Sequence, residues 1–485
     1  MSSVAASFGA AGSRGRSLVD RVADEGPVVI VAALFAALIA RVAEPYMLQP
    51  DSWLTFLGGR EIAARGIPRT DSLTLMTDGH RWIDQQWLAQ LATFELEHAI
   101  GVAATVAVFG VLVVAVFASA CALARRTASA RSVALFAVPV FLVAFCAVRA
   151  QALSYVLYIP LFALLCSESH RPTRRVWFAL PMLMLWANLH GGVLIAAALV
   201  ALLGATDLVQ RRVARGLGLM VGAGASIFVT PYGAGIVDYY RSTMGNPLFK
   251  KFITEWQPPT FVSWVGVPFF VTAGAAIVLI ARRPRALSVF EILALGMTLV
   301  GGLMAMRSIV WFDYGALLLL PQVLDRAWPA RRLALPMRSL VAGAAVLFVA
   351  FAVFITARAA GTAQAGIDEA YPPAALHAVA AALARDPSAR VLADDRTSDW
   401  LLYRLPQLRN RIAFDGRWEV LSQPQFALVR NFVTQAAPGV ARLTHGYRIF
   451  VVDRTWHKQL ARWYATRRGL RVLYRGSRVA VYERP

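Results

Sequence analysis

Residues 99–126, AIGVAATVAVFGVLVVAVFASACALARR, decide the fold class of this chain. The stretch carries no charged residue before Arg125, and it is long enough for an α-helix to cross a hydrocarbon core about 30 Å thick. Arg125 and Arg126 end the run, and Arg131 follows soon after. An apolar run with a basic loop at one end is typical of a membrane span whose basic end faces the cytoplasm.

Apolar runs of this kind recur before position 358. The whole chain is 58% hydrophobic and only 16% charged, which excludes an ordinary soluble enzyme. We predict spans at 27–44, 99–122, 132–147, 152–166, 176–189, 192–209, 216–230, 265–281, 288–305, 309–323 and 338–357. The remainder is polar, rich in arginine and without long apolar runs. The sequence thus predicts a polytopic α-helical membrane protein with about eleven transmembrane helices and a small C-terminal α/β domain.

Basic residues in the loops set the predicted topology. The loops after even-numbered spans carry arginine clusters, namely Arg125 with Arg126, Arg171 with Arg174 and Arg175, Arg211 and Arg212 with Arg215, Arg282 and Arg283 with Arg285, and Arg326 with Arg331 and Arg332. The positive-inside rule places these loops and an N-terminal tail, 1–26, in the cytoplasm. An odd number of spans then leaves residues 358–485 on the periplasmic side of a bacterial inner membrane. Between these ends lies a membrane domain, 27–357, with a long first periplasmic loop, 45–98.

The net charge of +21 does not indicate a nucleic-acid-binding protein, because much of the excess lies in these short loops. Arg14, Arg16 and Arg21 precede the first span, and no small-residue cleavage site follows at the usual place. We therefore expect a retained anchor rather than a signal peptide. The three cysteines fall inside apolar runs, which indicates small buried side chains rather than disulfides or metal ligands: Cys121, Cys146 and Cys166.

The first outer loop predicts two helices. From Asp51, apolar and polar residues alternate at helical spacing, the pattern of an amphipathic helix lying in the membrane interface. The step at 66–68, Gly-Ile-Pro, ends this helix, and a turn at 78–79, Asp-Gly, precedes a second helix that holds Asp84 and Trp87.

Ionisable residues from separate segments fall on this same outer side. They are Asp51, Asp84, Arg149, His190, Glu255 and Arg307. Charged groups at membrane depth are costly, so each is a candidate for function. A carboxylate among them is suited to take a proton from an acceptor hydroxyl. The arginines are suited to hold a phosphate leaving group and offset the charge that it gains.

Each candidate also has a structural interpretation. Asp51 is suited to cap the helix that follows it. Arg149, close to Gln151 in a tight turn, is suited to reach lipid phosphate at the interface. His190 follows Asn188 in a turn with two glycines, where a hydrogen-bonded structural histidine is more common than a catalyst. Tyr232 lies at a depth where aromatic residues form the interfacial belt.

The sequence at these positions resembles a known superfamily. The similar motifs are Asp-Ser-Trp at 51–53, Gly-Ile-Pro-Arg-Thr-Asp at 66–71, Gln-Trp-Leu-Ala-Gln at 86–90, Asn-Leu-His-Gly-Gly at 188–192 and Phe-Asp-Gly-Arg at 414–417. They resemble the bacterial membrane glycosyltransferases of the GT-C superfamily, which includes protein mannosyltransferases and aminoarabinose transferases. The resemblance is greatest to uncharacterised members with a long first outer loop and a small C-terminal domain, and it covers nearly the whole chain.

This resemblance implies transfer of a hexosyl or pentosyl group from a polyprenyl-phosphate-linked donor at the outer face. The acceptor is left open as a lipid, a glycan or a protein, with membrane lipids as further partners. Asp51 matches the catalytic base of an inverting displacement, and the second acid is Asp71 or Asp84. Because Ser52 stands where a paired carboxylate is usual, the resemblance assigns no metal ligand and leaves Mg²⁺ or Mn²⁺ open. The implied donor-phosphate residues are Arg149, Gln151, Asn188, His190, Tyr232, Glu255 and Arg307.

The C-terminal domain shows alternating short elements. We predict strands at 390–394, 411–415 and 447–452, helices at 398–404, 423–434 and 455–468, and a hairpin of 470–474 with 478–483. No phosphate-binding loop or metal-ligand spacing is present in its sequence. Asp394, Asp395, Asp415 and Arg417 fall at strand ends, where they either face the outer site or form surface ion pairs. The domain is basic, which suits contact with anionic lipid or an acidic glycan.

Two other functions fit parts of this pattern. A ligase or polymerase of lipid-linked polysaccharides would rely on Arg and His in outer loops, but it would have no need for an early acidic base such as Asp51. A transporter or flippase would place charges near mid-membrane, with broken helices and internal repeats. The sequence shows no such repeat, so the glycosyltransferase interpretation accounts for more of it.

Overall fold

A computed structural model describes residues 18–43, 47–143, 148–329, 334–434 and 443–485. Several residues used above lie outside these ranges: Arg14, Arg16, Cys146, Arg331 and Arg332. Within them, Cys121 is buried and Cys166 is partly buried, and both are free thiols.

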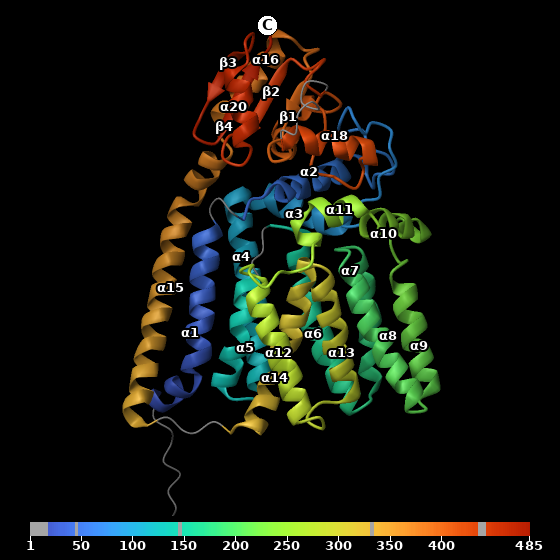
Figure 1. Ribbon diagram of the computed structural model, residues 1–485, viewed down its shortest axis with the longest axis vertical. Coiled ribbons are helices and arrows are strands. Elements are labelled where there is room, and N and C mark those ends of the chain that lie inside the picture. Colours follow the sequence, from blue (N-terminus) through green and yellow to red (C-terminus); the bar gives the residue numbers. More distant parts are fainter. Residues whose placement is uncertain (1–17, 44–46, 144–147, 330–333, 435–442) are drawn as a thin grey trace, which may run out of the picture.

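Apolar helices stand side by side in one bundle (Figure 1). In chain order they are α1 (Leu18–Ala43), α4 (Val102–Arg125), α5 (Ala130–Val143), α6 (Ala150–His170), α7 (Ala179–Ala187), α8 (Val193–Val209), α9 (Val213–Ser226), α12 (Gly266–Arg282), α13 (Val289–Met304), α14 (Ile309–Ala327) and α15 (Leu335–Ala370). In the described residues, α1, α4, α6 and α15 contain stretches long and apolar enough to cross a membrane alone. The predicted fold class is confirmed, because each predicted span corresponds to one helix of this multi-pass bundle.

Small residues allow two of these helices to approach closely. A Cβ added at Gly204 of α8 would lie 2.7 Å from the carbonyl oxygen of Gly216 in α9. A Cβ added at Gly216 would likewise lie 2.6 Å from the carbonyl oxygen of Gly204. Backbone contact at small residues is the usual way in which membrane helices associate, since lipid is as apolar as leucine.

A layer of shorter helices covers one end of the bundle (Figure 1). It contains α2 (Pro50–Arg65), α3 (Trp87–Ile100), α10 (Ile236–Met244) and α11 (Pro247–Phe252). Both helices of the first loop form, although Asp84 precedes α3 instead of lying in it. Residues 52–59 of α2 are all buried, and α2 packs against α3 and the C-terminal domain, so these residues do not form an exposed apolar face; the position of α2 in the interface stays a prediction.

The C-terminal domain lies above this layer (Figure 1). Its sheet has the order β1-β2-β4-β3, with β1 (Val391–Ala393), β2 (Ile449–Asp453), β3 (Arg471–Arg475) and β4 (Val479–Glu483). β1 and β2 are parallel, and the other neighbours are antiparallel. The helices are α16 (Pro373–Arg385), α17 (Ser398–Arg404), α18 (Gln423–Val433) and α20 (Lys458–Thr466).

One predicted strand of this domain is absent from the described sheet. Residues 411–415 make only isolated bridges, from Ile412 to Val391 and to Thr74. The backbone N–H groups of Leu75 and Met76 donate to the carbonyls of Ile412 and Ala413. The segment is therefore shared between β1 and the first outer loop, and it is too short to form a ladder with either.

The C-terminal domain is attached firmly to α2. The indole of Trp53 packs edge-on against Tyr371, with ring centroids 5.0 Å apart, and Tyr371 packs against Trp400 of α17. Arg60 of α2 donates hydrogen bonds to the carbonyls of Leu402 and Tyr403. These contacts fix the domain over the first outer loop.

Candidate functional site

Four charged side chains meet at the end of the bundle that faces the C-terminal domain, and we call them the outer cluster: Asp51, Arg149, Glu255 and Arg307. The Nη2 atom of Arg149 lies 2.6 Å from Oδ2 of Asp51, and its Nη1 atom lies 3.5 Å from Oε2 of Glu255. Arg307 approaches Oε1 of Glu255 at 3.6 Å. The cluster alternates two acids and two bases, so its formal charges cancel.

Two members lie at the start of a helix, and two lie in short 3-10 helices. Asp51 lies in the first turn of α2, where the helix dipole favours a carboxylate; the N-cap itself is Gln49. Arg149 is the N-cap of α6. Glu255 lies in the 3-10 helix η3 (Thr254–Trp256), and Arg307 lies in η4 (Met306–Ser308). The chain therefore brings together residues from four separate segments.

Exposure distinguishes this cluster from an ordinary buried ion pair. The side chains of Asp51 and Arg149 retain 45% and 27% of their accessible surface. Burial opposes ionisation of Glu255, but the guanidinium groups of Arg149 and Arg307 hold its pKa below the usual value. The guanidinium of Arg307 also lies 4.5 Å from the ring centroid of Trp256. The arginines are thus held in place while part of their surface is open to a ligand.

His190 lies beside the cluster in the turn between α7 and α8. Its ring is almost buried, and Nδ1 accepts a hydrogen bond from the Gly192 N–H at 3.0 Å. Burial lowers the pKa of His190 well below the usual value, and the charges of Arg307 and Arg149 lower it further. Because Nδ1 is an acceptor, the neutral ring carries its proton on Nε2, which makes that nitrogen a donor.

The structure places three other candidates in different surroundings. The Oδ1 atom of Asn188 accepts from the Trp87 indole, and its Nδ2 donates to the carbonyls of Met184 and Val229. The hydroxyl of Tyr232 donates to the Pro68 carbonyl and accepts from the Asp84 N–H. Both side chains therefore tie the turns to the first loop. Gln151 is partly buried in the first turn of α6.

A second ion cluster joins the two domains, and we call it the interdomain triad: Asp71, Asp415 and Arg417. One guanidinium nitrogen of Arg417 lies 2.8 Å from Asp71 and 2.6 Å from Asp415. The central guanidinium carbon of Arg417, Cζ, lies 4.3 Å from the centroid of the Trp82 ring. Only 2% of the Arg417 side-chain surface is exposed. The triad is a buried ion-pair network that links the two domains, and it is not accessible to a ligand.

Two carboxylates lie near both clusters. Asp84 is buried; its Oδ1 accepts from Gln90 Nε2 at 3.0 Å, and its Oδ2 has no hydrogen-bond partner among the described residues. Burial and the charge of Glu419 raise the pKa of Asp84 to about 7, against the opposing effect of Arg417. Burial likewise raises the pKa of Glu419 to about 7, and Asp415 and Asp51 contribute.

Glu419 is a residue that the sequence prediction missed. Arg417 is held by the triad and the Val420 carbonyl lies 3.2 Å from His80 Nδ1, so the backbone on either side of Glu419 is anchored to the first loop. Its charge acts on Asp84 and on Tyr239 of α10. The available signal was its position two residues after Arg417, just beyond the Phe-Asp-Gly-Arg motif at 414–417.

The group of side chains that best matches a metal-ion geometry within the described ranges lies elsewhere, at the ends of β1 and β2. It contains Asp394, Asp395 and His457. Asp394 accepts hydrogen bonds from the backbone of Arg396 and Thr397, and His457 Nε2 lies 2.8 Å from Asp395. Burial disfavours the imidazolium, but these carboxylates raise the pKa of His457 to about 9. An ion pair accounts for this group.

Comparison with solved structures identifies the fold. The chain is similar to ArnT from Cupriavidus metallidurans in the apo state, with 17% identity, a TM-score of 0.52 and coverage of 94% of this chain and 98% of that one. The chain has the GT-C fold. It is also similar to the apo oligosaccharyltransferase of Archaeoglobus fulgidus, with 14% identity, a TM-score of 0.50 and coverage of 90% and 70%. A third structure, at 13% identity and a TM-score of 0.50, is AglB from the same archaeon with an inhibitory peptide and a dolichol-phosphate. No family model and no curated protein matches the sequence.

The outer cluster lies at the end of the helical bundle that faces the C-terminal domain, and aromatic side chains of this domain reach toward it. Trp418 packs on Phe426 of α18, and Phe426 packs on Phe249 of α11. Phe249 in turn contacts Trp256, next to Glu255. Aromatic contacts thus connect the C-terminal domain to the segment that carries Glu255 of the outer cluster.

Proposed function

We propose that this chain is a membrane glycosyltransferase that transfers a sugar from a polyprenyl-phosphate-linked donor to an acceptor at the outer face of the inner membrane. The observation that carries the proposal is the outer cluster. It combines a half-exposed carboxylate in a first helical turn with two arginines that share a second carboxylate. The GT-C fold supports this proposal at the level of architecture.

The proposed binding step exchanges one anion for another. Arg149 and Arg307 are neutralised by Asp51 and Glu255, and a donor phosphate would compete for the same guanidinium groups. The neutral His190 offers Nε2–H as a further donor to a phosphate oxygen. Binding of phosphate to Arg149 would release the Asp51 carboxylate from its ion pair and leave it free to act as a base.

The proposed chemical step is a single displacement that inverts the anomeric carbon. Asp51 takes the proton of an acceptor hydroxyl as that oxygen attacks the anomeric carbon. The bond from that carbon to the phosphate oxygen breaks, and polyprenyl phosphate leaves with the electron pair. The arginines offset the negative charge that develops on the leaving group. The acceptor, whether lipid, glycan or protein, would enter beside the C-terminal domain.

The proposed orientation follows from the basic loops at the opposite end of the bundle. The N-terminus would lie in the cytoplasm, and the C-terminal domain in the periplasm. A polyprenyl chain would then lie along the lipid-facing side of the bundle with its phosphate at the depth of the outer cluster.

The test is release of polyprenyl phosphate by the purified full-length protein, supplied with a panel of polyprenyl-phosphate sugars and a mixture of hydroxylated acceptors. Asp51→Asn should lower the rate by about 10²- to 10⁴-fold, the usual contribution of a general base. Asp78→Asn is the matched control, because Asp78 is an exposed carboxylate of the same loop. Asp51→Asn turning over as fast as wild type would remove Asp51 from the mechanism.

A further inference from the structure

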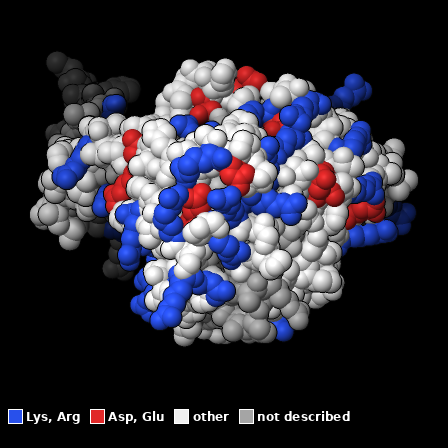
Figure 2. Space-filling view, turned by 90° about the horizontal axis from the view of Figure 1, so that it is seen from above, with Lys and Arg blue, Asp and Glu red and all other residues white. Residues whose placement is uncertain are grey.

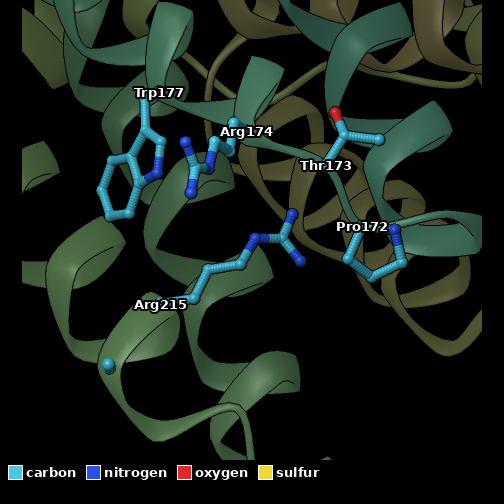
Figure 3. A pocket seen from close by; sticks show the side chains of 6 residues that line it. Pro172, Thr173, Arg174, Trp177 and Arg215 are labelled. Atoms are coloured by element: carbon cyan, nitrogen blue, oxygen red, sulfur yellow. The ribbon is translucent and has the colours of Figure 1, made fainter.

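A cavity of about 370 Å³ lies at the end of the bundle opposite the C-terminal domain. Its lining comes from the loop after α6, the 3-10 helix η1 (Arg174–Phe178) and the first turn of α9. The lining residues are Pro172, Thr173, Arg174, Trp177, Ala214 and Arg215. Figure 3 shows the guanidinium of Arg174 beside the indole of Trp177, and the guanidinium of Arg215 directed toward Pro172.

Arg215 forms the fixed side of this cavity. Its guanidinium lies 2.9 Å from Glu168 and 3.1 Å from Asp207, and both carboxylates are almost completely buried. Arg212 and the backbone of Thr173 share the same two carboxylates. The Nε atom of Arg215 is buried without a hydrogen-bond partner among the described residues. The fixed side therefore presents a cation whose position is set by the fold.

Arg174 forms the exposed side. It belongs to η1, and within the described part of the chain no acidic side chain forms an ion pair with it. Glu168 and Asp207 balance the charges of Arg212 and Arg215, so among the described residues the uncompensated positive charge at the cavity is that of Arg174. Arginine forks bind phosphate oxygens in pairs, and the adjacent indole offers a face for an organic headgroup.

The surface beside the cavity indicates what carries the anion. Trp177 and Phe178 of η1 and Leu217 and Val221 of α9 are large apolar side chains that are exposed. On a helix bundle in a membrane, such a surface faces lipid chains. A ligand at the cavity would thus have its anionic group between the arginines and its apolar part along α9, which describes an amphiphile better than a free ion.

We infer that this cavity binds the phosphate of an anionic phospholipid headgroup at the membrane surface opposite the outer cluster. The site is independent of the proposed sugar transfer, since none of its residues touches the outer cluster. General attraction of a basic loop to anionic lipid would depend equally on the neighbouring residues Arg174 and Arg175. A site in the cavity would depend on Arg174 alone, because only Arg174 lines the cavity.

The test compares these two arginines. Native mass spectrometry of the purified full-length protein measures retention of phosphatidylglycerol, with phosphatidylcholine as the zwitterionic comparison. Arg174→Gln should weaken phosphatidylglycerol binding about fivefold, the effect of one cation near an anionic headgroup. Arg175→Gln, also exposed and next in sequence, should leave binding unchanged. A melting curve of each variant without lipid reports that both are folded.

Each alternative has its own result. If Arg174→Gln and Arg175→Gln weaken binding equally, the lipid responds to the summed charge of the loops and the cavity is not a site. If phosphatidylglycerol and phosphatidylcholine are retained equally, no anionic headgroup is selected, and the inference fails. If inorganic phosphate displaces phosphatidylglycerol at equal concentration, the ligand is a free anion and the lipid assignment is overturned.

Discussion

The outer cluster and the interdomain triad use the same chemistry for different ends. Both combine aspartate or glutamate with arginine, and both join segments that are distant in sequence. In the outer cluster, the side chains of Asp51 and Arg149 retain a quarter to a half of their surface. In the triad, Arg417 and its two aspartates are almost completely buried.

This difference in exposure determines what each cluster is able to do. Half-exposed ion pairs contribute about 0–1 kcal/mol to stability, so exchanging one partner for a ligand anion costs little. A buried pair that loses one partner leaves an uncompensated charge in a medium that solvates it poorly. The outer cluster is therefore suited to binding, and the triad to holding the C-terminal domain over it. Figure 2 shows the face above them, where Lys and Arg outnumber Asp and Glu in the visible residues.

The largest expected effect is on the triad. Arg417→Met would leave Asp71 and Asp415 buried without their cation, which should destabilise the protein by about 3–5 kcal/mol. The measurement is the melting temperature of the purified protein, with Arg462→Ala as an exposed arginine control in the same domain. An unchanged melting temperature for Arg417→Met would show that the triad does not fasten the domains.

The next effect is on the outer cluster, where binding should change more than stability. Arg307→Ala removes one of the two cations proposed to hold a phosphate, so affinity for polyprenyl phosphate should fall about tenfold. Titration calorimetry or a lipid-binding assay measures this change, with Arg241→Ala of α10 as the exposed control. Equal affinity in Arg307→Ala and wild type would separate Arg307 from the phosphate site.

A different kind of effect, a pH dependence of stability, is expected at Asp84 between the two clusters. The pKa of Asp84 is raised to about 7, chiefly by burial, so the folded protein keeps its proton where the unfolded chain has lost it. The stability from this group is complete below its unfolded pKa of about 4 and is lost as the pH rises to about 7. Asp84→Asn should therefore gain stability relative to wild type across that window and level off above it. Melting curves at several pH values test this, and a difference that does not change with pH would contradict it.

The membrane helices could be predicted from the sequence because each span is decided by local hydrophobicity. Leu335–Ala370 shows the limit of that signal, since the apolar run ends near position 357 while the helix continues into polar sequence. Side-chain partners depend on tertiary contacts, which no local pattern encodes. Asp71 was a candidate acid in the sequence, yet its carboxylate pairs with Arg417 of the other domain. Glu419 was missed for the same reason, because only the docking of the C-terminal domain brings it near Asp84.

The most direct test of the proposed site is thermal stabilisation of the full-length protein by polyprenyl-phosphate sugars and by polyprenyl phosphate alone. If the phosphate binds the outer cluster, wild type and Asp51→Asn should both be stabilised at micromolar ligand, because the carboxylate serves the chemistry. Arg307→Ala should lose most of the stabilisation. Absence of any shift in wild type, or an equal shift in all three proteins, would contradict a phosphate site at the outer cluster.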